Sequence, residues 1–378
     1  MGVAAALALL DEPATTKLPP LECLFTVDEE TGMTGASGLD GSMLSGRTML
    51  NLDTEEWGDV FIGCAGGGDT MLSLELERAP LPAGWAVRGW RLGGLLGGHS
   101  GLDIHEDRGS AVRLAARLVE GAFAARPGGD VALVGFRGGD KRNAIAREAE
   151  FVLAGPPEAL HGAVAQAVAA VFEELVVEYG SLERAMSLDA AEASAAAVLT
   201  PAATDRLLLL LLGLPHGVVK FSHAIPGLVE TSTNLAAVRV KAEEPSKLTL
   251  EIITCTRSSV DSALRDVRVA ICRIGRAAGA VIDQEPAYPG WLPEPEARVV
   301  KLASQVIEEI TGKTPEVKAI HAGLECGIIG EKLPGCQSVS YGPTIRGAHS
   351  PDERVEISTV GPFYQATLAL LGRLADAN

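Results

Sequence analysis

Residues 23–35 read Cys23-Leu-Phe-Thr-Val-Asp-Glu-Glu-Thr-Gly-Met-Thr-Gly35. The apolar run that ends at Val27 predicts a buried strand. Three carboxylates follow it directly, and Gly32 and Gly35 then permit a sharp turn. Open α/β sheets place their chemistry at the carboxyl ends of strands, where one acid can hold a metal while its neighbour handles a proton. A solvated acidic turn is the other interpretation of the same residues.

The composition is that of a soluble globular protein, and it limits the possible partners. The chain has 378 residues, of which 47% are hydrophobic and 21% are charged. At this length two domains are expected rather than one. The net charge of −17 argues against a nucleic-acid partner, because nucleic-acid binders carry a basic face. An excess of acid suits a protein that binds cations.

Cysteine usage and the apolar segments indicate a cytoplasmic protein. None of the six cysteines forms a Cys-x-x-Cys pair, and most stand in apolar, strand-like surroundings. We therefore expect reduced thiols and no structural zinc ribbon. The leucine-rich run Leu207–Leu212 is far shorter than the about 20 residues of a membrane span, so we expect no membrane partner.

The order of elements predicts an α/β fold that is interrupted by a second module. Strands alternate with helices up to about residue 66, and the same style returns after about residue 286. Between these points Leu72, Leu74 and Leu76 alternate with polar residues, as in a half-exposed antiparallel strand. We therefore expect a split α/β domain with a mixed or parallel sheet, and an inserted α+β module that consists of two parts.

Two further residues can join the acids of the opening stretch. Asp53 follows the second predicted strand, and His349 lies in a glycine- and proline-rich loop after a late strand. Together with Glu30 they form an oxygen and imidazole set that suits zinc, manganese or cobalt, with Glu29 as the neighbouring base. Zinc lowers the pKa of its bound water to about 7, and a carboxylate can take the proton during attack on a carbonyl. By itself, Asp53 is more typical of a capping acid.

Motifs along essentially the whole chain resemble the cytosolic aminoacyl-histidine dipeptidases (Xaa-His or β-Ala-His dipeptidase, peptidase D). These metallopeptidases belong to the same clan as carnosinase and the aminoacylases. The matching stretches follow the family order and are Thr26-Val-Asp-Glu-Glu-Thr-Gly-Met33, Asn51-Leu-Asp-Thr-Glu-Glu56, Gly63-Cys-Ala-Gly-Gly67, Gly97-Gly-His-Ser-Gly101, Arg142-Asn-Ala-Ile145, Val229-Glu-Thr-Ser232, Ala287-Tyr-Pro-Gly-Trp291, His321-Ala-Gly-Leu-Glu-Cys-Gly327 and Gly342-Pro-Thr with His349-Ser-Pro-Asp-Glu353.

The resemblance implies metal-dependent hydrolysis of dipeptides and a division of labour among the matched acids. Glu29 would be the general base that activates the water between a pair of zinc ions, with manganese or cobalt as alternatives. Glu30 and His349 would hold one ion, and Asp53 would contribute to the other.

The resemblance also implies roles for residues of the inserted module. His99 is similar to the lid histidine that steadies the oxyanion, and such donors act where charge develops. Asn143 and Arg257 resemble lid residues that bind the backbone or carboxylate of the substrate, for which a planar Arg fork is suited. Glu325 lies near the predicted site and would support substrate binding. The remaining histidines receive no role: His105, His161, His216, His223 and His321.

The implied architecture is a split zinc-peptidase catalytic domain with an inserted lid. The catalytic domain would comprise residues 1–66 and 286–378, and residues 67–285 would form the lid or dimerisation domain. A homodimer through that lid is the expected assembly.

Two segments of the family pattern do not occur in this sequence. The family has His-x-Asp-x-Val and Ala-Asp-Asn-Gly segments, which supply a metal-binding His and the Asp that bridges both metals. Met1-Gly2-Val3 aligns just after the second segment, so we expect that residues upstream are missing. Without those ligands the chain is expected to bind metal weakly and to hydrolyse little.

Two other functions fit the same residues. A non-catalytic relative that keeps the lid for binding or dimerisation would be stable and soluble without metal. An amidohydrolase acting on N-acyl amino acids would share the mechanism and differ only in its substrate.

Overall fold

The computed structural model describes residues 1–126, 128–348 and 352–376, apart from the side chains of Glu30 and Thr31. The helices are α1 Gly2–Leu10, α2 Glu29–Gly32, α3 Thr34–Gly38, α4 Ala111–Ala124, α5 Pro157–Ala159, α6 Ala165–Tyr179, α7 Pro201–Gly213, α8 Asp261–Ala277, α9 Arg298–Thr311, α10 Glu325–Lys332 and α11 Ile357–Ala375. The strands are β1 Thr48–Asn51, β2 Val60–Cys64, β3 Gly66–Pro80, β4 Ala86–Gly93, β5 Gly98–His99, β6 Ala132–Gly138, β7 Ala144–Ile145, β8 Ala149–Gly155, β9 Ser187–Glu192, β10 Ala197–Leu199, β11 Gly217–Phe221, β12 Val229–Glu244, β13 Lys247–Ser258, β14 Val281–Gln284, β15 Val317–Ile320, β16 Gln337–Ser340, β17 Ile345–Arg346 and β18 Arg354–Val355.

The first sheet draws its strands from both ends of the chain, in the order β1-β16-β2-β15. β1 runs parallel to β16 and β2 runs parallel to β15, while β16 meets β2 in antiparallel fashion. Helices α1, α9 and α11 bury an apolar core against it, and α3 and α10 form a second, smaller core. The fold is therefore a mixed sheet flanked by helices, as the sequence predicts.

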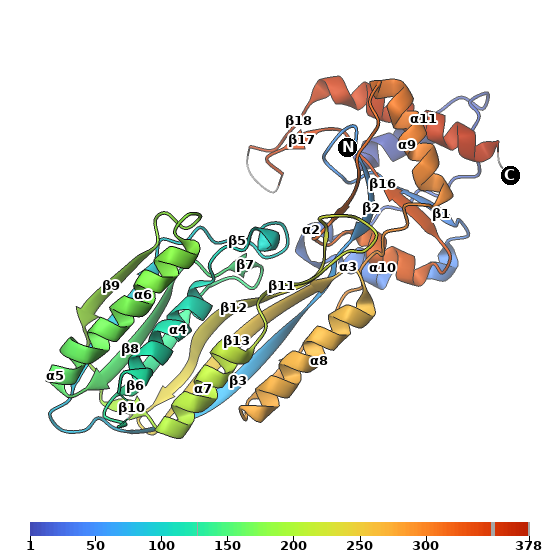
Figure 1. The fold of residues 1–378 in the computed structure, drawn as a ribbon. Helices are drawn as coiled ribbons and strands as arrows, with labels where there is room; N and C mark the ends of the chain where they lie inside the picture. Colours follow the sequence, from blue (N-terminus) through green and yellow to red (C-terminus); the bar gives the residue numbers. More distant parts are fainter. Residues whose placement is uncertain (127, 349–351, 377–378) are drawn as a thin grey trace.

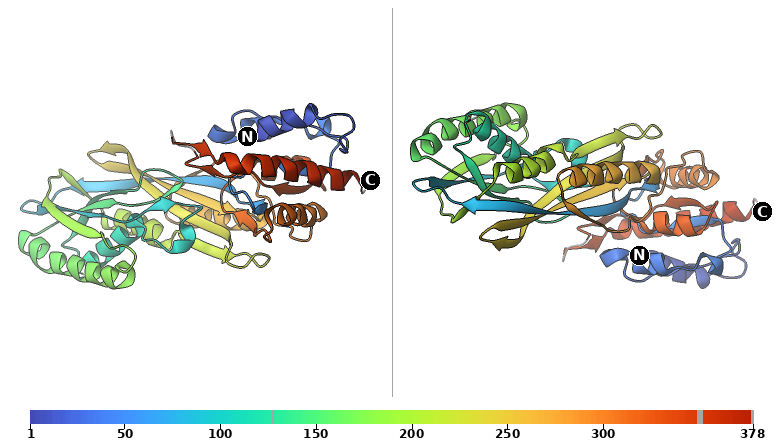
Figure 2. Two further views of the ribbon diagram at one scale, coloured as in Figure 1. Left: turned by 90° about the horizontal axis from the view of Figure 1, so that it is seen from above. Right: turned by 90° about the horizontal axis from the view of Figure 1, so that it is seen from below.

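The second sheet is larger and lies entirely between residues 66 and 284. Its main path is β10-β3-β13-β12-β6-β8-β4-β9, with β11 added to β12 and β14 added to β3. Helices α4, α6, α7 and α8 share one apolar core with this sheet. The long strands β3, β12 and β13 run from the outer end of this body to the first sheet, and the two bodies lie end to end (Figures 1 and 2).

The alternation in β3 is confirmed and shows how sequence selects the face of a strand. Leu72, Leu74 and Leu76 are fully buried, and the residues between them are more exposed. Period-2 alternation of this kind sends every second side chain to one face of the sheet. β3 pairs with β13 in antiparallel fashion along its length, which also agrees with the prediction.

The prediction of a buried strand for the apolar run that ends at Val27 is wrong. No strand is assigned between α1 and β1, and β1 is the edge of the first sheet among the described residues. The side chain of Val27 is 70% exposed, and Phe25 is also exposed. An apolar run alone does not specify a strand, because the backbone N–H and C=O groups must also form hydrogen bonds with a neighbouring strand.

Helix α1, Gly2–Leu10, is buried along one side only. Ala5 and Leu9 of α1 are buried, whereas Val3, Leu7 and Leu10 are exposed. In Figure 2 this segment lies beside α11, and Tyr364 of α11 donates a hydrogen bond to Glu12 at 2.8 Å. α1 therefore packs through one narrow face.

Gly66–Gly68 form the start of β3. These glycines are buried where segments cross closely, so a Cβ at Gly67 would lie 2.7 Å from the hydroxyl oxygen of Tyr288. A Cβ at Gly68 would lie equally close to the Arg268 guanidinium. The absence of a side chain thus allows close packing here and does not mark a turn.

The continuous helix 157–179 has the length and composition of a membrane span, with a mean hydropathy of 1.5 in its most apolar window. It comprises α5, a π-helical turn and α6. In the fold it contributes Leu160, Val168 and Leu175 to the core of the second sheet. Core helices of soluble proteins share these properties, so length and composition alone do not assign it to a bilayer.

Candidate active site

Glu29 is placed by an unusual local backbone. It is the first residue of the short helix α2, which lies between two residues in the left-handed region, Asp28 with φ 62° and Met33 with φ 53°. Thr34 donates a hydrogen bond to the Asp28 carboxylate at 2.8 Å and thereby closes the turn. Non-glycine residues in this region are strained, and such strain is concentrated at functional sites.

The predicted metal ligands Glu30 and His349 fall where the structure gives no side-chain position. His349 lies outside the described residues, and the backbone of Glu30 is described within α2 without its side chain. Asp53 is described: it follows β1, is exposed, and its backbone N–H donates to the side chain of Asn51.

A second carboxylate stands close to Asp53. Glu325 begins α10, and its Oε2 accepts a hydrogen bond from Thr26 at 2.8 Å. Its other oxygen, Oε1, is buried and has no partner among the described residues. Burial raises the pKa of Glu325, and the negative charge of Asp53 raises it further. The segment before α2 and the segment after β15 therefore converge on this carboxyl group.

The described residues do not complete a metal site. Within that part of the chain, no group of three or more His, Cys, Asp or Glu residues is arranged to hold an ion. Asp53 and Glu325 supply carboxylates of the right chemistry, but structural and catalytic zinc sites need at least three protein ligands. No metal geometry follows from these residues alone.

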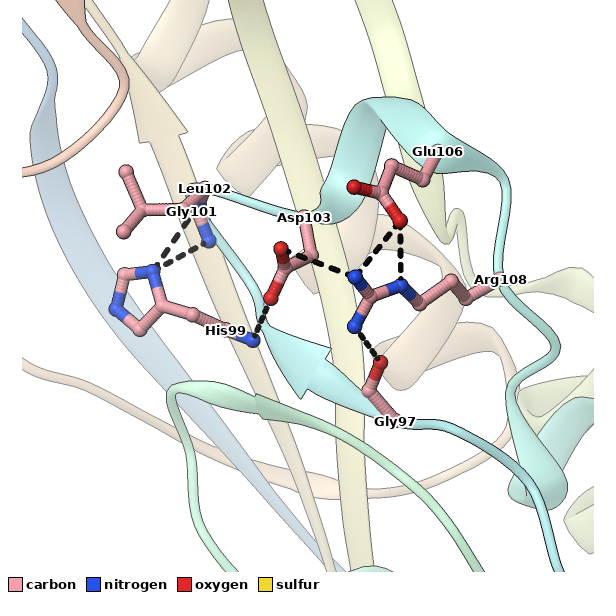
Figure 3. A network of polar contacts seen from close by, with 7 residues as sticks. All are labelled: Gly97, His99, Gly101, Leu102, Asp103, Glu106 and Arg108. Carbon is pink, nitrogen blue, oxygen red and sulfur yellow. Dashed lines mark hydrogen bonds and ion pairs between the residues drawn. The ribbon is translucent and has the colours of Figure 1, made fainter.

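His99 is held by its own loop in a defined tautomer. Its Nδ1 accepts hydrogen bonds from the backbone N–H groups of Gly101 at 3.2 Å and Leu102 at 3.1 Å, as Figure 3 shows. The neutral ring must therefore carry its hydrogen on Nε2, where it can be donated. Burial lowers the pKa of His99, and the positive charge of Arg257 lowers it further, so the neutral form is favoured.

Ion pairs and hydrogen bonds hold the loop around His99 together. Asp103 accepts the backbone N–H of His99 at 2.7 Å and an Arg108 N–H at 3.2 Å. Arg108 also donates to Glu106 and to the carbonyl of Gly97, both at 2.7 Å (Figure 3). The whole segment is thus connected as one unit on the edge of the second body.

Arg257 lies at the end of β13 that faces the first sheet. Its side chain is buried, donates to the Tyr288 hydroxyl at 3.4 Å, and leaves its Nε without a partner among the described residues. Its charge lowers the pKa of both His99 and His321, which places the three side chains near one another. The second body therefore presents a cation beside a neutral imidazole.

Asn143 belongs to the same neighbourhood. Its carbonyl accepts the backbone N–H of Ser100 at 2.8 Å, and the next residue, Ala144, pairs with His99 in the small β5–β7 ladder. The side chain itself is exposed. The structure thus places Asn143, His99 and Arg257 together, although they are far apart in sequence.

The segment 321–325 joins the two groups of residues. His321 lies near enough to Arg257 for that positive charge to lower its pKa, and Glu325 accepts a hydrogen bond from Thr26 and lies near Asp53. Between them, a Cβ at Gly323 would lie 3.3 Å from Tyr288 and 3.4 Å from Met33, which caps α2. The acidic stretch, the lid residues and this segment therefore meet at one place between the two sheets.

No role for His321 follows from the sequence, although the structure buries it at the centre of this meeting point. Its Nε2 lies 2.8 Å from the hydroxyl of Ser232. Ser232 and Tyr288, the other residues without a predicted role, are also part of the site. All three belong to quoted motifs, so their position within motifs was the only available signal.

Because the imidazole of His321 is buried, we expect the stability of the fold to depend on pH. Burial lowers the pKa of this imidazole to about 3, from 6.5 in the unfolded chain. Between these values the unfolded state binds a proton that the folded state does not, so acidification lowers the unfolding free energy by about 1.4 kcal/mol per pH unit. Denaturant unfolding between pH 7 and pH 4 should show a shallower loss in His321→Gln than in the unaltered protein. If the unfolding free energy fell equally with pH in both proteins, the lowered pKa of His321 would be contradicted.

Comparisons with known proteins give consistent matches. The model of peptidase family M20/M25/M40 matches residues 1–373. The cytosol non-specific dipeptidase of Escherichia coli (strain K12) is 37% identical over 374 residues, which are 98% of this chain and 75% of that protein. The crystal structure of aminoacylhistidine dipeptidase from Vibrio alginolyticus superimposes with a TM-score of 0.91 at 39% identity, covering 98% of this chain and 74% of that one. Aminopeptidase PepT from Bacillus cereus shares the fold, with a TM-score of 0.53 at 14% identity over 99% of this chain and 70% of its own.

Proposed function

The chain belongs to peptidase family M20/M25/M40, and on this premise we propose that it hydrolyses dipeptides, with Xaa-His and β-Ala-His among them, in a metal-dependent reaction. The first sheet and its helices, residues 1–66 and 286–378, would form the catalytic domain. Residues 67–285 would form the lid, which contributes His99, Asn143 and Arg257.

The arrangement of His99 is the observation that supports this proposal most strongly. Two backbone N–H groups occupy Nδ1, so the hydrogen on Nε2 is available to a ligand. A neutral imidazole that donates from a fixed position can stabilise the negative oxygen that develops when water adds to a peptide carbonyl. The depressed pKa keeps this donor neutral at physiological pH.

Glu29 is proposed as the general base. It would take a proton from the attacking water as the oxygen bonds to the peptide carbon, and it would return that proton to the leaving amine as the C–N bond breaks. Its place at the start of α2, after the strained Asp28, fixes its backbone. His99 would meet the carbonyl oxygen from the opposite domain.

Arg257 and Asn143 are proposed to bind the ends of the dipeptide. The Arg257 guanidinium is buried with an unpartnered Nε, so it can bind the substrate carboxylate in a fork of two hydrogen bonds. The exposed Asn143 side chain stands beside the His99 strand and can bind the substrate backbone. Glu325, with its free Oε1, is proposed to support substrate on the side of the first sheet.

The family uses divalent metal, and we propose zinc as the ion, with manganese or cobalt as alternatives. Glu30 and His349 would hold one ion, and Asp53 would contribute to the other. A bound ion would supply a water of lowered pKa for the base to deprotonate.

Removing metal is expected to abolish hydrolysis. Treating the purified protein with a chelator should reduce β-Ala-His cleavage to the blank rate, because the attacking water then has its ordinary pKa. Adding back zinc, manganese or cobalt singly should restore the rate and identify the preferred ion. Elemental analysis provides the control, since full activity in protein shown to be metal-free would contradict the proposal.

A homodimer through the lid is proposed from an exposed apolar surface at the end of α6. Val177 is 86% exposed, with Val176 and Leu182 also exposed nearby. A second copy seated there would bury these side chains. Val177→Glu should weaken the dimer in sedimentation analysis, while Val269→Glu on the exposed face of α8 should not. A monomer at all concentrations would refute the dimer.

We further propose a cytoplasmic location. The Escherichia coli relative is described as a cytosol protein. All six cysteines are free in the structure, which suits a reducing compartment.

A further inference from the structure

His321 stands where three separate segments meet. It follows β15 of the first sheet, is only 7% exposed, and its ring contacts Ser232 of β12 in the lid. Its backbone carbonyl lies against the His99 loop, because a Cβ at Gly101 would lie 2.2 Å from that oxygen. The same Cβ would lie 3.0 Å from Cε1 of His99. One residue therefore contacts both the lid sheet and the loop that carries the proposed oxyanion donor.

The contact between His321 and Ser232 is fixed by its surroundings. Ser232 is almost fully buried and sits opposite Arg257 in the β12–β13 ladder. Burial and the positive charge of Arg257 keep the His321 ring neutral, so one ring nitrogen accepts while the other carries the hydrogen. Breaking this contact would leave the buried Ser232 hydroxyl and the buried Nε2 of His321 without a partner, which makes the two groups costly to separate.

The His99 loop can transmit this contact because it is connected internally. The two N–H groups that orient the His99 ring belong to Gly101 and Leu102, and Gly101 is the residue that touches the His321 carbonyl. Asp103 and Arg108 tie the remainder of the loop together (Figure 3). A shift of Gly101 would therefore move the N–H groups that set the tautomer and direction of His99.

We propose that His321 is a positioning residue, which fixes the His99 loop against the catalytic sheet by binding Ser232 through its ring and abutting Gly101 through its carbonyl. We call the contacts of His321 with Ser232 and Gly101 the clamp. The role of His99 in catalysis rests on the function proposed above, but the clamp itself rests on geometry alone. His321 also begins the segment that carries Glu325, so the clamp couples the lid side of the site to its carboxylate side.

Hydrogen–deuterium exchange without substrate tests the clamp directly. His321→Leu removes the hydrogen bond to Ser232, and we expect the amides of residues 99–103 to exchange at least about tenfold faster. His321→Gln can place an amide near the position of Nε2 and should restore most of the protection. The matched control is His161→Gln, a half-exposed lid histidine that contacts Arg88 and lies outside the proposed machinery.

Two further variants test the same clamp without altering the ring of His321. Ser232→Ala should accelerate exchange in the same loop, and combining it with His321→Leu should add little, because both remove one contact. Gly101→Ala adds a methyl group against the His321 carbonyl, at a position whose φ is not positive, so it acts by displacement. It should also raise loop exchange and lower kcat more than it raises KM.

The outcomes separate the clamp from the proposed reaction. Faster exchange confined to the His99 loop supports the clamp, whatever the activity. Unchanged exchange there in His321→Leu, or an equal rise in every peptide, overturns it. If the unaltered protein hydrolyses no dipeptide, the function proposed above fails, while the exchange data still decide the clamp.

Discussion

Glu29→Gln should lower kcat for β-Ala-His by about a hundredfold to ten-thousandfold, with little change in KM. The amide has nearly the same size as the carboxylate but cannot take a proton from water. Because Glu29 is only half-buried, the fold should be retained, and thermal unfolding should show a midpoint close to that of the unaltered protein.

A matched control distinguishes the base from a general loss of negative charge. Glu331→Gln makes the same change on the exposed side of α10 and should leave kcat unaltered. If Glu29→Gln retained more than a tenth of the activity, Glu29 could not be the base. A loss of similar size in Glu331→Gln would point to electrostatics and not to proton transfer.

His99→Ala should lower kcat by about a hundredfold to a thousandfold, the usual cost of removing one oxyanion donor. The loss should fall on kcat more than on KM, because the hydrogen bond strengthens as negative charge develops on the carbonyl oxygen. Steady-state kinetics with Ala-His and β-Ala-His would measure both constants. His99→Gln, which keeps an N–H donor on a side chain of similar reach, should recover part of the rate.

His105 provides the control for this experiment. It is exposed, lies in the short turn Ile104–Glu106 of the same loop, and has no predicted role. His105→Gln should therefore leave both kinetic constants unchanged. A KM effect alone in His99→Ala would assign His99 to substrate binding and exclude it as an oxyanion donor.

Local patterns in the sequence predict elements well where packing and periodicity agree. The alternating leucines of β3 are an example. The prediction fails where long-range neighbours decide the outcome. The apolar run that ends at Val27 has the pattern of a strand but no neighbouring strand with which to pair.

The chemistry of the candidate site can likewise be predicted from the sequence only in part. Motif order pointed to His99 and Arg257, but the N–H groups that fix the tautomer of His99 depend on the path of its loop. Neither the buried Oε1 of Glu325 nor the contact between His321 and Ser232 can be read from spacing, because burial depends on the folded chain and the contact joins segments from the two different sheets. Burial and partner identity are properties of the folded chain.

Hydrolysis of β-Ala-His by the purified chain with added divalent metal, measured beside Glu29→Gln from the same preparation, tests the proposed function most directly. We expect histidine release that stops with chelator and exceeds the rate of the variant by about a hundredfold or more, even if the absolute rate is low. The variant also controls for contaminating peptidases. Equal rates in the two proteins at saturating metal would contradict metal-dependent hydrolysis by this site.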